Sequence, residues 1–141
     1  MIAEKTVTIL GKEVHVRYCT ATETGFEIMS GKKMDVFTPV TRTNDSGRLE
    51  IVEPARATTI DYLYLALSAV LAAYEREGLE APITDNELLY DASPSEVETL
   101  LTAVMTLRSE WYGIPKVVEE IIESDKKGRK AEEAAEDSEK N

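Results

Sequence analysis

The clearest pattern in the chain is a run of thirteen residues, Tyr62 to Tyr74, that carries no charge and only one aliphatic hydroxyl, Ser68. A helix on the surface of a small protein needs a polar face, and this run barely has one. It is also too short to cross a bilayer, which takes roughly 20 apolar residues. We therefore expect this helix to lie at the centre of a small core, or to offer one side to another chain.

The helix around this run is predicted to start after Thr58 and to stop at Gly78, with Asp61 completing a capping box. Large apolar side chains recur on one side at three- and four-residue spacing, and mostly small ones occupy the other side. We expect the N-terminal strands and a second helix to cover these two sides, or part of the small side to stay open. The large side holds Ile60, Leu63, Tyr64, Leu67, Val70, Leu71 and Tyr74, and the small side holds Tyr62, Leu65, Ala66, Ala69, Ala72 and Ala73.

A second long helix is predicted over residues 94–112, with one apolar stripe and one polar side. Ser93, Pro94 and Glu96 supply a cap, a proline at the first helical position and a capping-box glutamate. Shorter helices are expected over 84–91 and 115–123. Residues 124–141 are charged and lack large apolar side chains, so we expect a flexible tail.

Alternating apolar and polar residues near the N-terminus predict a β-hairpin. Its two-residue loop, Gly11-Lys12, starts with glycine as a type II′ turn requires, so the numbers of paired residues should sum to 23. This register separates an apolar face from a polar face. The expected pairs are Ile9 with Val14, Val7 with Val16, Thr8 with His15, and Thr6 with Arg17.

The hairpin is followed by a helix predicted to run from a capping box at Thr20–Glu23 to Ser30, with Gly31 as its stop. Residues 36–41 and 48–52 then read either as strands joined by a turn at 44–47 or as a mobile loop. Pro39 would keep the first strand at an edge or bulge. The prediction is an α+β fold with a single domain over 1–123, comprising a hairpin-containing part (1–57) and a helical part (58–123).

The net charge of −11 is concentrated on the helical part. Residues 58–123 hold 3 Lys/Arg against 13 Asp/Glu, whereas residues 1–57 hold 8 of each. This part would repel phosphate backbones, which argues against nucleic-acid binding. One cysteine, no signal pattern and no membrane-length apolar segment favour a cytoplasmic protein without a membrane partner.

Residues that could carry catalysis are scarce. His15 is the only histidine and Cys19 the only cysteine, and no neighbouring ligand completes a zinc site or a Cys–His pair. The seven glycines form no phosphate-binding loop. We therefore expect no enzyme activity, no catalytic residue, no cofactor and no metal site.

The helical part resembles a known family in its layout. The segments IDYLYLALSAVLAAYEREG (Ile60–Gly78) and ITDNELLYDASPSEVETLLTAVMTLRSEWYGIP (Ile83–Pro115) follow a hairpin-bearing part. Together they resemble small, acidic phage or prophage tail assembly chaperones. Members of that family keep the long, largely helical tape-measure protein soluble, help to recruit tail-tube subunits, and are absent from the finished tail. The resemblance implies a non-enzymatic protein of the host cytoplasm that transiently binds apolar helical segments.

A groove between the two long helices is the expected client site, in the helix-in-groove mode. A self-associating structural or adaptor protein, or an acidic inhibitor-type partner of a basic protein, is the alternative. A homo-oligomer would fit the self-associating alternative. The expected partner-binding residues are Tyr62, Leu65, Ala69, Ala73, Trp111 and Tyr112.

Overall fold

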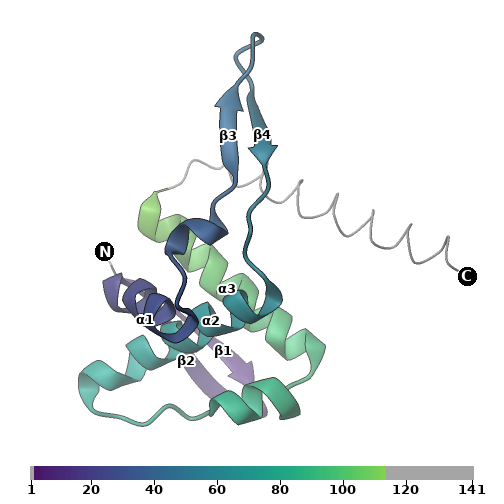
Figure 1. The fold of residues 1–141 in the computed structure, drawn as a ribbon. Helices are drawn as coiled ribbons and strands as arrows, with labels where there is room; N and C mark the ends of the chain where they lie inside the picture. The colour runs from purple at the N-terminus through teal and green to yellow at the C-terminus, as the bar shows by residue number, and fades with distance from the viewer. Residues whose placement is uncertain (1, 114–141) are drawn as a thin grey trace, which may run out of the picture. The chain divides into compact units, whose positions relative to one another are not determined.

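The computed structural model describes residues 2–113 and has the predicted α+β fold, an antiparallel hairpin followed by helices (Figure 1). The described chain forms two compact units. The larger unit joins the N-terminal residues up to Met34 to residues 57–113, and the smaller unit contains residues 35–56. The helix expected over 115–123 and the tail expected over 124–141 lie outside the described residues.

Strands β1 (Ala3–Ile9) and β2 (Lys12–Tyr18) form the N-terminal hairpin, but the predicted register was wrong by two residues. Val7 pairs with Val14 and Thr6 with His15, because the loop is Leu10-Gly11. Both loop residues have positive φ, 53° and 74°, which is the type I′ turn whose twist matches that of the strands. A shift of two preserves the alternation of side chains, so the predicted apolar face is still the buried one.

Helix α1 (Thr20–Ser30) has the predicted bounds and stops at Gly31, whose φ is 70°. The predicted cap was wrong by one residue. Cys19 is the N-cap, and its N–H donates to Thr22 Oγ1 at 3.2 Å. Glu23 is thereby left to accept a hydrogen bond from the Tyr18 hydroxyl at 2.7 Å.

Helix α2 (Thr59–Tyr74) is held at its N-terminus by the predicted capping box of Thr58 and Asp61. A 3₁₀ turn, η2 (Glu75–Glu77), continues it to Gly78. Asp61 is buried and also accepts from Lys32 Nζ at 2.9 Å, which joins the end of α1 to the start of α2.

The chain then forms a short π-helical turn, η3 (Glu87–Asp91), and helix α3 (Pro94–Tyr112). Both predicted caps are present: Thr84 Oγ1 accepts from the Glu87 N–H, and Ser93 Oγ accepts from the Glu96 N–H. Glu96 also accepts from the Leu10 N–H at 2.5 Å, so the capping residue of α3 fixes the hairpin turn.

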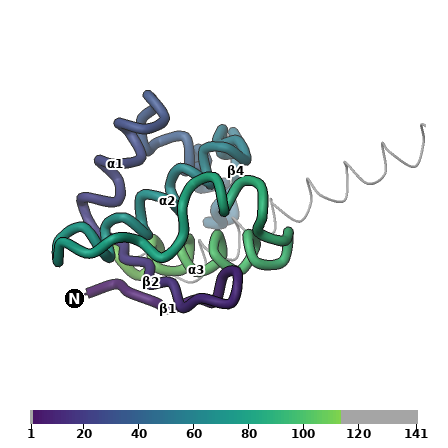
Figure 2. Tube along the Cα trace, turned by 90° about the horizontal axis from the view of Figure 1, so that it is seen from below, coloured from purple at the N-terminus to yellow at the C-terminus, as the bar shows by residue number. Residues whose placement is uncertain are grey.

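The larger unit has a simple layered arrangement. Helix α2 packs on β2, and α3 packs on β1 and β2, so both helices cover one side of the hairpin (Figures 1 and 2). Helix α1 packs on the side of α2 away from the hairpin. The largest fully buried side chains of this unit come from all five elements and η3: Ile9, Val14, Val16, Tyr18, Phe26, Leu65, Val70, Leu88, Leu100, Val104 and Leu107.

The smaller unit is a hairpin of strands β3 (Val40–Thr43) and β4 (Leu49–Glu53), which confirms strands between 36 and 52, although residues 36 and 37 belong to the 3₁₀ turn η1 (Met34–Phe37). The pairing shifts register just after Pro39, where an edge or bulge was expected. Its turn is fixed by Asn44 Oδ1, which accepts from the N–H groups of Ser46 and Arg48. At the base, the Arg56 N–H donates to the Val36 carbonyl at 2.9 Å.

Candidate partner-binding surface

The side of α2 that was expected to bind a partner lies in the core. Leu65 and Ala69 are both 0% exposed. Small residues bring α1 close here: Ser68 Oγ donates to the Thr22 carbonyl at 2.6 Å, and a Cβ at Gly25 would overlap that hydroxyl. The prediction of a binding groove along Leu65 and Ala69 was therefore wrong, because both side chains are buried in the core and cannot contact a partner.

The opposite side of α2 carries large apolar residues that are partly exposed in the structure of residues 2–113. Ile60, Tyr64, Leu67 and Leu71 recur at four-, three- and four-residue spacing and so share one side of the helix. Ile60 is 42% exposed and Leu71 is 37% exposed, while the two residues between them are half-buried. We call these four residues the outer stripe of α2.

The C-terminal end of α3 is tied to α1 and β2 through one carboxylate. Glu23 accepts hydrogen bonds from both the Tyr18 and the Tyr112 hydroxyls. The Arg108 guanidinium lies 5.3 Å from the centre of the Tyr112 ring, and the Trp111 and Tyr18 rings are 6.5 Å apart. Burial and the neighbouring Glu23 raise the pKa of Tyr18, and the same causes raise the pKa of Tyr112 to about 12.

The six residues expected at the partner site do not form one surface. Trp111 and Tyr112, 37% and 50% exposed, lie together at the end of α3. Tyr62 and Ala73 are half-buried at opposite ends of α2, with the buried Leu65 and Ala69 between them. Within this set only the aromatic pair of α3 combines large apolar area with access to solvent.

The outer stripe was missed because large side chains were expected to form the core. Small residues permit closer packing, and α2 packs against β2 on one side and α1 on another. The charge of Asp61 on the small side pointed the wrong way, because a carboxylate is usually exposed. Its burial depends on the Lys32 and Thr58 contacts, which only the fold supplies.

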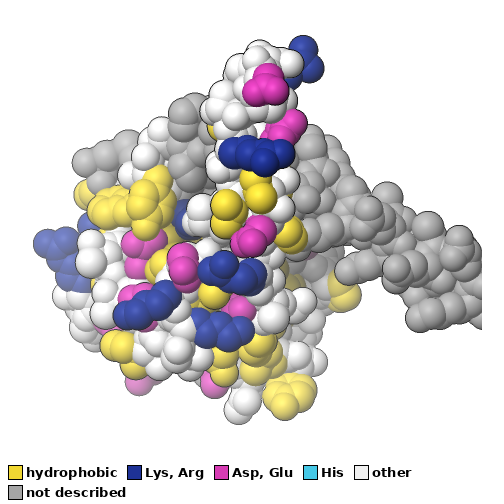
Figure 3. Space-filling model, turned by 45° about the horizontal axis from the view of Figure 1, so that its top comes forward, with side chains coloured by type: hydrophobic (Ala, Val, Ile, Leu, Met, Phe, Trp, Pro, Cys, Tyr) yellow, Lys and Arg dark blue, Asp and Glu magenta, His cyan; other side chains and the backbone are white. Residues whose placement is uncertain are grey.

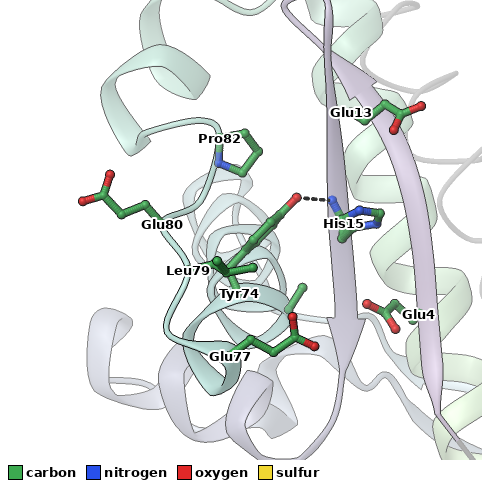
Figure 4. A pocket seen from close by; sticks show the side chains of 9 residues that line it. Glu4, Glu13, His15, Tyr74, Glu77, Leu79, Glu80 and Pro82 are labelled. Atoms are coloured by element: carbon green, nitrogen blue, oxygen red, sulfur yellow. Dashed lines mark hydrogen bonds between the residues drawn. The ribbon is translucent and has the colours of Figure 1, made fainter.

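A cavity of about 500 Å³ lies beside the hairpin (Figure 4). His15 and Tyr74 meet in it: the backbone N–H of His15 donates to the Tyr74 hydroxyl at 3.0 Å, and the centres of their rings are 5.8 Å apart. Leu79 and Pro82 form an apolar wall opposite the strands. Four carboxylates also line it, from Glu4, Glu13, Glu77 and Glu80. The cavity is thus complementary in charge to a basic group.

Other chemistry is sparse in the part of the chain that the structure describes. Residues 2–113 contain no group of three or more His, Cys, Asp or Glu side chains arranged to hold a metal ion. Over the same residues, no helix is both long enough and apolar enough to cross a membrane. On the face drawn in Figure 3, hydrophobic side chains form several patches separated by charged groups of both signs. Binding to this face would involve small apolar areas and nearby charges together.

The described residues thus present partly exposed apolar side chains and nearby carboxylates. Comparison with known proteins adds no relative: no protein-family model, no curated protein and no solved structure matches the chain.

Proposed function

We propose that the protein is a non-enzymatic phage tail assembly chaperone that transiently binds apolar helical segments of a tape-measure-like protein. The observation that carries the proposal is the outer stripe of α2, a row of large apolar side chains on a helix that also forms the core on its other side. The resemblance of residues 58–115 to that family supports the same function. Under this proposal the protein acts in the host cytoplasm, with a tail-tube subunit as a further partner.

The geometry of the stripe suits a helical client. Residues spaced as Ile60, Tyr64, Leu67 and Leu71 follow one line along α2, along which the apolar face of a second helix can pack. Burial of apolar area contributes roughly 25 cal/mol per Å² before ordering costs are subtracted. Because Tyr64 and Leu67 are already half-buried, the remaining gain is small. Weak, reversible binding is what a chaperone that leaves the finished assembly requires.

Changing the stripe should abolish client binding without unfolding the protein. We expect Leu71→Asp to reduce recovery of a co-expressed tape-measure-like protein at least tenfold, because a charge would have to be desolvated in the interface. The measurement is a pull-down at low and at high salt, with the bound chain identified by mass. The matched control is Ile28→Asp on α1, where the side chain is 79% exposed and lies outside the stripe. Equal loss in both variants, or none in either, would contradict the proposal.

A second candidate is an acidic partner of a basic protein, and the acid-lined cavity favours it. Binding through carboxylates is screened by salt, whereas binding through apolar contacts depends little on it. In the same pull-down, a basic chain released at high salt would support this second candidate. A helical chain retained at high salt supports the chaperone.

A further inference from the structure

The two outer edges of the N-terminal hairpin differ in how their backbone groups are satisfied. A two-residue type I′ turn closes on a hydrogen-bonded pair, here Ile9 and Lys12, and bonded and non-bonded pairs then alternate along the strands. On β2 the backbone N–H and C=O groups of the non-bonded residues therefore point away from β1. Two of these groups have hydrogen-bond partners. The His15 backbone N–H donates to the Tyr74 hydroxyl, and the Arg17 carbonyl accepts from the Thr22 hydroxyl at 2.6 Å.

The corresponding positions on β1 are Glu4, Thr6 and Thr8. Within the described chain, no hydrogen bond satisfies their outward-pointing N–H and C=O groups. All three residues are exposed, and β1 contains no proline and no register shift. An open edge of this kind is a template for pairing with another strand.

We propose that the outer edge of β1 binds one extended segment of a partner protein by strand addition. The three exposed residues offer three N–H donors and three C=O acceptors on one side of the strand. Main-chain hydrogen bonds then give affinity, and the side chains flanking them give selectivity. This inference is independent of the outer stripe of α2, which would bind a helix.

Helix α3 is the long helix that packs against the open edge strand. It contacts both β1 and β2, whereas α2 packs on β2. A strand added to β1 would therefore lie beside α3 as well as beside β1. By helical spacing, the flank of α3 around Glu96 carries the small residues Thr99, Ala103 and Thr106. A second copy of this chain that pairs through its own β1 is the competing occupant, and the experiment below separates it from a lone strand.

The charges on β1 specify the occupant further. Glu4 and Lys5 are adjacent, so they point to opposite faces of the sheet, and both are exposed. A complementary segment places a basic residue opposite Glu4 and an acidic residue opposite Lys5. Opposite the remaining residues of β1, the partner segment should carry β-branched residues, which pack well in strands. The partner segment is therefore an extended, β-branched stretch with neighbouring acidic and basic residues.

The test uses a fluorescein-labelled peptide, Val-Thr-Val-Thr-Glu-Arg-Val, which pairs antiparallel with β1 and sets its Glu opposite Lys5 and its Arg opposite Glu4. We expect saturable binding by anisotropy, and protection of the Thr6 and Thr8 amides from hydrogen exchange in the full-length protein. Exchanging the peptide's Glu and Arg should weaken binding several-fold. N-methylation of the amides that face β1 should abolish binding, whereas N-methylation of the alternate amides should not.

Thr6→Pro removes one outward N–H at a position where β2 does not use it, and we expect at least a tenfold loss of affinity. Thr6→Val keeps the N–H and should bind like the wild type. If Thr6→Pro lowers the unfolding temperature, the two N-methylated peptides still decide, because they leave the protein unchanged. Equal binding of both, or no protection of the Thr6 and Thr8 amides at saturating peptide, would overturn the proposal. Dimerisation through β1, lost in Thr6→Pro, would also overturn it.

Discussion

Asp61 shows how much of the larger unit depends on one buried carboxylate. It accepts the Thr58 N–H at 2.9 Å, which caps α2, and the Lys32 ammonium at the same distance, which fixes the residue after α1. Burial alone would raise the pKa of Asp61, but the Thr58 and Lys32 hydrogen bonds outweigh it and the pKa is lowered. The charged form is therefore the one that the fold stabilises.

Stability should depend on the charge of Asp61 in a defined pH range. A carboxyl whose pKa falls on folding contributes stability above its ordinary pKa, about 3.9, and loses it as pH falls through the lower folded value. We expect Asp61→Asn to cost about 1 kcal/mol of unfolding free energy at pH 7. The difference from the wild type should close below about pH 4. Urea unfolding of both proteins between pH 7 and pH 2.5 measures this, and a difference independent of pH would contradict it.

Tyr112 makes a prediction in the alkaline range. Its folded pKa of about 12 lies above the ordinary value of about 10, so its contribution to stability is complete below pH 10 and is lost as pH rises through 12. A wild-type minus Tyr112→Phe difference titration, followed by tyrosinate absorbance, should show one step near pH 12. A step near pH 10 would mean that the hydrogen bond to Glu23 does not persist in solution.

At the scale of elements, the close contact of α1 with α2 is set by two small residues. Gly25 leaves space for Ser68 Oγ, which is held by the Thr22 carbonyl and is buried. Because that hydroxyl has a fixed partner, it cannot turn aside for a larger neighbour without breaking the hydrogen bond. The two helices therefore meet at a distance that only this pair of side chains permits.

A double-mutant cycle tests this contact. Gly25→Ala should destabilise the fold by about 1–3 kcal/mol through overlap with Ser68. Ser68→Ala alone should cost about 1 kcal/mol for its hydrogen bond. In the double variant the overlap is relieved, so its cost should fall below the sum of the two single changes. Thermal or urea unfolding of the four proteins gives the coupling, and additive effects would show that the helices simply move apart.

Elements whose ends are marked by local chemistry could be predicted from the sequence, and those fixed by tertiary contact could not. The caps at Thr58 and Ser93 act within one turn, because in each case two residues three positions apart form the capping box. The register of the N-terminal hairpin depends on which two residues form its turn. The turn residue Leu10 donates its backbone N–H to the carboxylate of Glu96, which lies far along the chain, and this contact is not visible in the local sequence. The outer stripe of α2 escaped prediction for a similar reason. Which side of an apolar helix is covered depends on how closely α1 and β2 approach.

At the scale of the whole molecule, the smaller unit is closed at its base. The Arg56 N–H bonds to the Val36 carbonyl, and the Arg56 guanidinium lies 3.3 Å from the Asp35 carboxylate. The β3 residues are all exposed, and β4 is exposed or half-buried. Neither strand therefore contributes a fully buried side chain.

Replacing residues 40–53 with a short Gly-Ser linker should leave the larger unit folded. The ends of the removed segment are held near each other by the Val36–Arg56 hydrogen bond, and shortening a loop changes closure entropy little. We expect the unfolding temperature to shift by less than about 3 °C. Calorimetry with Arg56 retained checks this, and loss of cooperative unfolding would show that the strands are required by the rest of the chain.

The alternation of side chains along the N-terminal hairpin limits how this chain can change over evolutionary time. Side chains alternate with a period of two within each strand, so residues added to the turn leave Val7, Val14 and Val16 in the core. A single residue inserted within one strand would instead reverse which of the following side chains face the core. Changes in length should therefore be found in the turn, with a single-residue insertion in a strand accommodated as a bulge.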